Sequence, residues 1–254
     1  MTTGITGFEP RVDFVVGGVQ KGGTTSLDRL LRTHPAVGMA SVKEPHWFDT
    51  DERFASGTCD YAPYHALWGA QLASRLCGDA TPSYVWWPEA ARRIRHYNPD
   101  MRWVLLLRDP AGRAYSHWNM QRERGNEPLA FPAALDAEEE RLRPSAPQDV
   151  RRHSYVSRGY YARQLERLWS LFPKEQTLVL MSGQLRETPV ETAESIAEFL
   201  GIEPFSSAEA ISENEGTYAE PMSPRDRERL VRLYEPDIRA VERMLGWDLS
   251  AWLR

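Results

Sequence analysis

A glycine-rich turn that carries a lysine and three hydroxyl side chains lies near the start of the chain, directly after an apolar run at 13–19. Successive backbone N–H groups in such a turn, together with the N-terminus of a following helix, bind anions. Glycine lets the backbone approach the ligand, lysine adds a positive charge, and hydroxyl groups add hydrogen-bond donors. The sequence therefore predicts a phosphate-binding loop made of Gln20, Lys21, Gly22, Gly23, Thr24, Thr25 and Ser26.

The spacing of this loop differs from that of nucleotide triphosphatases. Their P-loop places the lysine directly after the last glycine and follows it with a magnesium-binding serine or threonine. In this chain Lys21 precedes Gly22 and Gly23 instead. Asp109 follows an apolar run and could imitate a magnesium-holding aspartate, but Arg108 stands beside it, where such a site should be anionic. A P-loop-type nucleotide kinase is therefore kept only as an alternative.

A second pair of candidate anion ligands lies further along the chain. Arg108 closes the apolar run at 102–108, and Ser116 follows within the next helical segment. An arginine at the end of a strand and a serine on the adjacent helix can both bind a phosphate. Either residue alone would be read as a salt-bridged arginine or a surface serine. Two anion sites on neighbouring strand–helix units indicate a nucleotide with phosphates at its 5′ and 3′ positions, whether the protein is an enzyme or a non-catalytic nucleotide-binding protein.

Apolar runs alternate with helical patterns along the chain, which is typical of an α/β fold with a central, mainly parallel sheet flanked by helices. In such folds ligands bind at the carboxyl ends of the strands. The expected strands are 13–19, 76–79, 102–108 and 177–181. After a first helix that ends near residue 34, the expected helices are 88–97, 110–125, 129–142, 160–172, 192–200 and 225–245.

The length of 254 residues predicts a single domain spanning 1–254. Within it, residues 143–152 have the composition of a mobile loop or lid, and Glu138, Glu139 and Glu140 are expected to form one solvated helix face. The net charge of −5 argues against nucleic acid as a partner. The two cysteines have no metal-ligand spacing, and no metal is expected. We see no signal peptide and no membrane span, and expect a cytoplasmic protein.

Four segments together resemble one known family. They are the strand and helix around GGVQKGGTTSL, residues 43–48, residues 81–84, and LLLRDPAGRAYSHW. The sequence is similar to the sulfotransferases that depend on 3′-phosphoadenosine 5′-phosphosulfate (PAPS), and most similar to the heparan-sulfate branch and its bacterial relatives. The resemblance covers nearly the whole chain and implies their P-loop-like fold.

The resemblance also implies roles for particular residues. Residues 21–26 would bind the 5′-phosphosulfate, and Arg108 with Ser116 would bind the 3′-phosphate. Glu44 matches the catalytic glutamate of the branch, and an ion pair with Lys43 or an arginine is kept as the alternative explanation for it. His46 is the neighbouring candidate base. The remaining candidate nucleotide contacts are Arg158, Tyr160, Gly216 and Thr217.

We expect the segment that holds Glu44 and His46 to be extended, so that both side chains face the same side. Burial beside Trp47 and Phe48 is expected to raise the pKa of Glu44 and to make it an effective base. The implied reaction is an in-line transfer of a sulfuryl group from PAPS to a hydroxyl, less readily to an amine, without a metal. Its second product would be adenosine 3′,5′-bisphosphate.

Two departures from the family pattern bear on the acceptor. Heparan-modifying members carry a lysine where this chain has Ala80, and they close over the nucleotide with a basic loop. This chain has no Lys or Arg between Arg186 and Arg225. Backbone amides at 216–217, or Arg158, would therefore have to replace the contacts that the basic loop makes with the nucleotide. Both departures argue against a polyanionic glycan. We expect a small-molecule, lipid or glycoside acceptor, free or borne by a carrier, and the sequence leaves the oligomeric state open.

Overall fold

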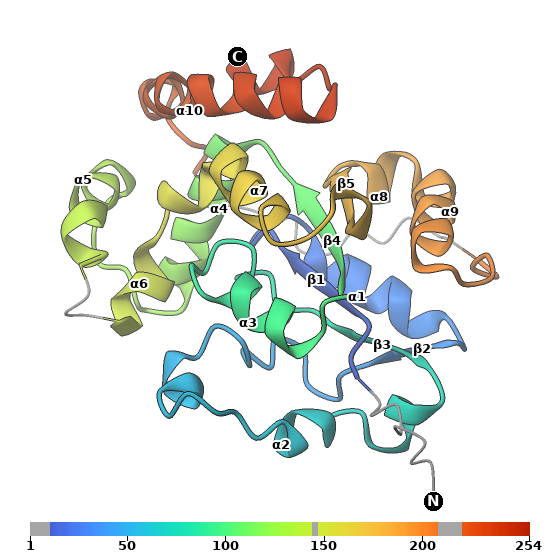
Figure 1. Cartoon of the computed structure of the whole chain (residues 1–254). Helices are drawn as coiled ribbons and strands as arrows, with labels where there is room; N and C mark the ends of the chain where they lie inside the picture. The colour runs from blue at the N-terminus through green and yellow to red at the C-terminus, as the bar shows by residue number, and fades with distance from the viewer. Residues whose placement is uncertain (1–10, 144–146, 208–219) are drawn as a thin grey trace, which may run out of the picture.

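The computed structural model describes residues 11–143, 147–207 and 220–254. A five-stranded sheet in the order β2-β3-β1-β4-β5 lies at its centre (Figure 1). Every neighbouring pair of strands is parallel, as the sequence predicts. The strands are β1 (Phe14–Gly18), β2 (Val37–Met39), β3 (Leu76–Asp79), β4 (Arg102–Leu107) and β5 (Thr177–Met181). Of these, sequence analysis missed only β2, which is too short to give a recognisable apolar run.

Helices connect the strands and cover both faces of the sheet, and most of them match the predicted segments to within a few residues. The first five are α1 (Thr24–Thr33), α2 (Ala62–His65), α3 (Ala90–Tyr97), α4 (Pro110–Glu123) and α5 (Phe131–Arg141). The others are α6 (Pro147–His153), α7 (Tyr161–Trp169), α8 (Gln184–Glu187), α9 (Pro189–Leu200) and α10 (Pro224–Leu245).

The side-chain alternation of the central strands builds two separate cores. On β4, Val104 and Leu106 pack on one face against the apolar side chains of α1, α8 and α9. Trp103, Leu105 and Leu107 point to the opposite face, which α3, α4, α7 and α10 cover. Both faces are buried, which explains why RWVLLLR reads as a continuous apolar run in the sequence.

The topology brings four loops to one edge of the sheet. Because β1, β2, β3 and β4 are parallel, their carboxyl ends meet there. From β1 the chain passes through α1 to β2, at one end of the strand order. From β3 it then crosses over β1 to β4, toward the other end. Such a reversal of strand order leaves a crevice at the carboxyl ends, where ligands of open α/β folds bind.

Two expectations about the second half of the chain are wrong. Residues 147–152 of the predicted loop at 143–152 belong to helix α6 (Pro147–His153). Glu138 is buried, unlike Glu139 and Glu140, and its carboxylate accepts hydrogen bonds from the backbone N–H groups of Val156 (2.5 Å) and Ser157 (2.8 Å). The charged run on this helix therefore contains one buried carboxylate, which connects α5 to the residues that follow α6.

Within the described residues, no helix combines the length and the apolar character that crossing a membrane requires.

Candidate active site

The predicted anion-binding loop joins the end of β1 to the start of α1, at the crevice. Gly22 is packed so tightly that a Cβ atom there would lie 2.4 Å from the carbonyl oxygen of Leu106. Gly23 precedes α1 with a left-handed φ of 96°, and a Cβ atom there would meet nothing within 4 Å. The loop is thus pressed against the sheet on one side and open on the other. An anionic group can approach the backbone at Gly23.

The polar side chains of this loop are only partly satisfied by the protein. Gln20 Oε1 is buried and has no hydrogen-bond partner in the described structure. Thr24 and Ser26 are buried at the start of α1, whereas Thr25 is half-buried. Burial, followed by the nearby charge of Arg108, lowers the pKa of Lys21 below its ordinary value. A bound anion would counter the charge repulsion, so the loop fits a phosphate or phosphosulfate group.

The two predicted anion sites are adjacent. Arg108 follows β4 directly, and its guanidinium Nη1 donates a hydrogen bond to the carbonyl oxygen of Lys21 at 3.2 Å. Tyr161 from α7 fixes the other side of this segment, since its hydroxyl donates to the carbonyl oxygen of Arg108 at 2.9 Å. Ser116 lies buried in α4, the helix that follows.

Asp109 has a structural role at this edge. Its carboxylate oxygens accept hydrogen bonds from the backbone N–H groups of Ala111 (3.2 Å) and Gly112 (3.1 Å), which caps the N-terminus of α4. The same carboxylate is ion-paired with Arg227 from α10. With both oxygens engaged, the aspartate that a nucleotide kinase would use to hold magnesium is already committed to other partners.

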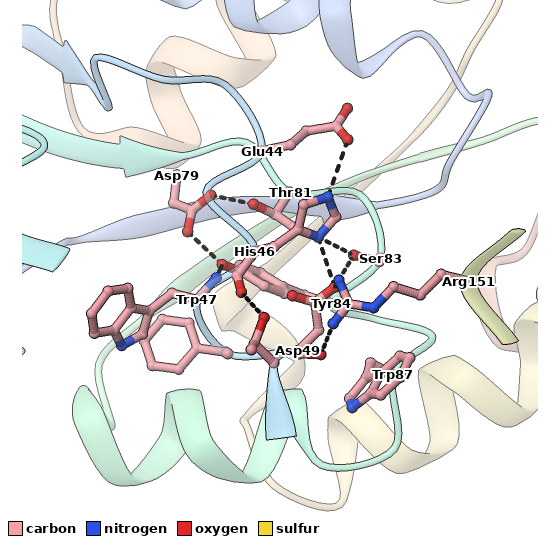
Figure 2. A network of polar contacts seen from close by, with 12 residues as sticks. Glu44, His46, Trp47, Asp49, Asp79, Thr81, Ser83, Tyr84, Trp87 and Arg151 are labelled. Carbon is pink, nitrogen blue, oxygen red and sulfur yellow. Dashed lines mark hydrogen bonds and ion pairs between the residues drawn. The ribbon is translucent and has the colours of Figure 1, made fainter. Parts of the chain in front are cut away.

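The loop after β2 carries the candidate bases, and its backbone is not extended as predicted. Glu44 and His46 have left-handed φ values of 56° and 50°, which are uncommon for residues with a Cβ atom. The two side chains nevertheless meet, with His46 Nε2 lying 3.5 Å from Glu44 Oε2 (Figure 2). The two side chains therefore lie on the same side, as predicted. The reason is a turn with left-handed φ angles and not the alternation of side chains along an extended strand.

His46 lies between two carboxylates. Its Nδ1 is 2.8 Å from Asp49 Oδ2, and the hydroxyl of Ser83 donates to the same oxygen at 2.6 Å. Arg151 from α6 also pairs with Asp49 at 3.5 Å, and its guanidinium lies over the ring of Trp87. The sequence drew no attention to Asp49 or Arg151. Asp49 directly follows the motif at 43–48 and could have been found, whereas Arg151 is 102 positions away from Asp49.

These contacts reverse the predicted tuning of Glu44. Burial alone would raise its pKa, but the hydrogen bond from His46 and the charge of Lys43, 2.5 Å away, lower the pKa to about 2. Burial opposes ionisation of His46 as well, yet hydrogen bonds to Asp49 and Glu44 raise its pKa to about 9. At neutral pH Glu44 is a carboxylate able to accept a proton, and His46 is an imidazolium with both nitrogens protonated.

We predict that the stability contributed by His46 depends on pH. Because its pKa is raised from 6.5 to about 9 in the folded protein, this contribution is fully present below pH 6.5 and is lost as the pH rises through 9. Urea unfolding should therefore show a larger loss of stability for His46→Gln at about pH 6 than at about pH 9.5. The side chain is 37% exposed, so solvent will weaken the effect. An equal loss at both pH values would contradict the charged pairing.

Two of the remaining predicted nucleotide contacts, Arg158 and Tyr160, lie on the segment just before α7, and the others lie outside the described residues. Arg158 is buried, donates to Ser154 Oγ at 2.6 Å, and stacks over Trp86 at 4.0 Å; burial lowers its pKa to about 9. The ring of Tyr160 packs edge-on against Tyr234 of α10. The neighbouring Tyr161, rather than Tyr160, contacts the Arg108 segment. Gly216 and Thr217 lie outside the described residues.

In the part of the chain that the structure describes, no group of three or more His, Cys, Asp or Glu side chains is arranged to hold a metal ion.

The parallel sheet, its reversal of strand order and the open glycine loop beside Arg108 define an α/β protein with the features of an anion-binding loop at the carboxyl ends of its strands. Residues 11–226 match the family model of the sulfotransferase domain, and the chain belongs to the sulfotransferase family. PAPS is the typical sulfuryl donor in this family.

Individual relatives agree with this assignment. Mouse heparan sulfate glucosamine 3-O-sulfotransferase 5 is 28% identical over 193 residues, which are 75% of this chain and 53% of that protein. Human bifunctional heparan sulfate N-deacetylase/N-sulfotransferase 2 is 30% identical over 201 residues, or 76% of this chain and 22% of that protein. The chain thus spans about half the length of the first of these curated relatives and less of the second. The crystal structure of a sulfotransferase from Alicyclobacillus acidocaldarius matches with a TM-score of 0.80 and 29% identity, covering 96% of this chain and 99% of that one.

Proposed function

We propose that this protein transfers a sulfuryl group from PAPS to a hydroxyl group of a small-molecule, lipid or glycoside acceptor. The observation that carries the proposal is the contact between Arg108 and the carbonyl oxygen of Lys21. It joins two anion-binding elements on neighbouring strands, as a nucleotide with both 5′ and 3′ substituents requires. The residues at 20–26 would hold the 5′-phosphosulfate, and Arg108 with Ser116 would hold the 3′-phosphate.

The proposed chemistry is a direct displacement at sulfur. The bond between sulfur and the bridging phosphate oxygen breaks, the acceptor oxygen bonds to sulfur, and the acceptor proton passes to Glu44. Lys21 stabilises the negative charge that develops on the departing phosphate. His46, held by Asp49, donates an N–H toward Glu44 and orients its carboxylate. The products are a sulfate ester and adenosine 3′,5′-bisphosphate.

Two features support an uncharged hydroxyl acceptor over a polyanionic glycan. The buried residue at position 80 is an alanine, so that position supplies no positive charge to an acceptor. The net charge of −5 also opposes the approach of a polyanion. Among the similar proteins are one named for O-sulfation and one named for N-sulfation, and either kind of acceptor would give up a proton to a base such as Glu44.

We predict that Arg108→Ala weakens binding of adenosine 3′,5′-bisphosphate by roughly 2–4 kcal/mol, because a charge-assisted contact is lost from a partly desolvated site. Binding of adenosine 5′-phosphate, which lacks the 3′ group, should barely change. Isothermal titration calorimetry with both nucleotides measures the difference. Arg92→Ala is a suitable control, because Arg92 is an exposed arginine paired with Glu89 on the surface. Equal losses for the two nucleotides would remove Arg108 from the 3′-phosphate site.

The two alternatives give different results in the same assay. A sulfotransferase releases adenosine 3′,5′-bisphosphate from PAPS only when an acceptor, such as a simple phenol, is present. A nucleotide kinase would instead produce ADP from ATP and lose activity with a chelator. A non-catalytic binding protein would bind adenosine 3′,5′-bisphosphate without turning over PAPS with any of a panel of hydroxyl acceptors.

A further inference from the structure

The loop that carries Glu44 and His46 has a backbone that must be held in place. Two residues within three positions have left-handed φ angles, and such conformations persist only when their surroundings fix them. Hydrogen bonds from three directions do so. Glu44 N donates to the carbonyl oxygen of Ala80 at 3.2 Å, and Thr50 Oγ1 donates to the carbonyl oxygen of His46 at 2.6 Å. The third bond runs from Trp47 N to the hydroxyl of Tyr84, at 3.0 Å.

The Tyr84 bond differs from the other two because it leads into the core. The tyrosine side chain is fully buried, and its hydroxyl donates its proton to Asp79 Oδ2 at 2.7 Å while accepting the Trp47 N–H. Both hydrogen-bonding functions of the hydroxyl are used, so its orientation is fixed. Asp79 is the last residue of β3, which places the anchor on the rigid sheet.

Asp79 is itself held by other hydroxyl groups. Thr81 donates to Oδ1 at 2.7 Å, and Tyr64 donates to Oδ2 at 2.9 Å. Burial raises the pKa of Asp79 to about 6, although the three hydroxyl donors oppose this shift. The residues facing this carboxyl are thus two tyrosines and a threonine, with the negative charge of Asp49 as the next charged neighbour. Of the three donors, only Tyr84 also bonds to the backbone of the Glu44 loop in the described contacts.

We propose that Tyr84 is a positioning residue for the reaction. Its hydroxyl connects Asp79, at the end of β3, to the Trp47 amide. This connection holds the turn in the geometry in which Glu44 and His46 meet. Tyr84 does not touch the reacting atoms. The proposal rests on the proposed function, because Glu44 matters for turnover only if it is the base.

The chain offers a matched control for this proposal. Tyr64→Phe and Tyr84→Phe each remove one hydroxyl from a fully buried ring bonded to the same oxygen of Asp79. Both substitutions should therefore lower stability by similar amounts. Only Tyr84→Phe also leaves the Trp47 amide without its acceptor. We expect it to lower kcat roughly 10- to 100-fold, as small misplacement of a catalytic group does, with the affinity for adenosine 3′,5′-bisphosphate unchanged. Tyr64→Phe should leave kcat near that of the parent protein.

A second readout does not depend on activity. NMR titration should give a raised pKa for His46 in the parent protein and in Tyr64→Phe, and a pKa shifted toward 6.5 in Tyr84→Phe, because the pairing with Glu44 is loosened. The His46→Gln spectrum identifies the resonance. Equal kcat values and equal His46 titrations for the two tyrosine variants would overturn the proposal.

Two further outcomes separate the possible failures. If the parent protein turns over no acceptor, the proposed function is in doubt, while the His46 titration still tests the position of the loop. If Tyr84→Phe does not fold, hydrogen exchange of the Trp47 amide in the parent protein provides the test. A buried bond to Tyr84 predicts slow exchange, and exchange as fast as in an exposed loop would overturn the proposal.

Discussion

Replacing Lys21 by alanine should lower kcat by on the order of 10²-fold or more, the usual consequence of removing a group that stabilises charge in the transition state. Lys21 stands in the loop between β1 and α1, and Arg108 bonds to its backbone oxygen. The same substitution should weaken nucleotide binding much less, because the backbone amides of the loop and Arg108 remain. The measurement is kcat at saturating PAPS with a phenol acceptor, together with the calorimetric affinity for adenosine 3′,5′-bisphosphate.

The control for this experiment is Lys174→Ala. Lys174 is a lysine outside the crevice, whose ammonium lies over the ring of Trp169. Its loss should leave both kcat and nucleotide affinity unchanged. If Lys21→Ala kept its kcat and only raised KM, Lys21 would serve in docking the nucleotide, and its proposed part in stabilising the leaving phosphate would be wrong.

Replacing Glu44 by glutamine should reduce turnover by roughly 10²–10⁴-fold, because the amide keeps the shape of the side chain but cannot accept the acceptor proton. The pKa values of the pair show which of the two side chains is free to accept a proton, although a pKa near 2 makes Glu44 a weaker base than the raised value expected from the sequence. Glu44 is ionised at neutral pH, with a pKa of about 2, whereas His46, with a pKa of about 9, already carries its proton. Nucleotide binding should stay intact, since Glu44 lies on the loop after β2 and not on the anion-binding loop.

His46→Gln is the companion variant, and it should cost much less turnover. Glutamine can still donate one hydrogen bond to Glu44, and the base itself remains. Turnover with a phenol acceptor at saturating PAPS separates the two residues. An active Glu44→Gln beside an inactive His46→Gln would make His46 the base. If both variants were active, neither residue would be the base, and the role of Glu44 would be its ion pair with Lys43.

The sequence alone predicted two things: the strands and α-helices other than β2, α2, α6 and α8, and a candidate anion-binding loop after the first strand. The reason is that both depend on local chemistry. The apolar run before Gly18 is typical of a buried parallel strand, and the glycine, lysine and hydroxyl residues that follow it lie within a few positions of one another. Arg108 and Ser116 were also predicted as a second anion site, because the carboxyl ends of the strands in a parallel sheet share one edge.

Only the tertiary structure decided how these pieces are combined. Lys21 and Arg108 are 87 positions apart, and the pairing of β1 with β4 brings them into contact. His46 contacts Asp49 and Ser83, and Arg151 from a third segment of the chain pairs with Asp49. The distances between these side chains cannot be derived from a sequence pattern.

The clearest example is the pKa of Glu44. The neighbouring Trp47 and Phe48 in the sequence suggested that burial would raise it, yet the folded protein lowers it. A pKa reflects the balance between desolvation and nearby charges, and charge interactions depend on separations of a few ångströms. The turn with left-handed φ angles at Glu44 and His46 places the imidazole 3.5 Å from the carboxylate. The residue types were visible in the sequence, but the charge state of Glu44 was set by the neighbours that the folded loop brings to its carboxylate.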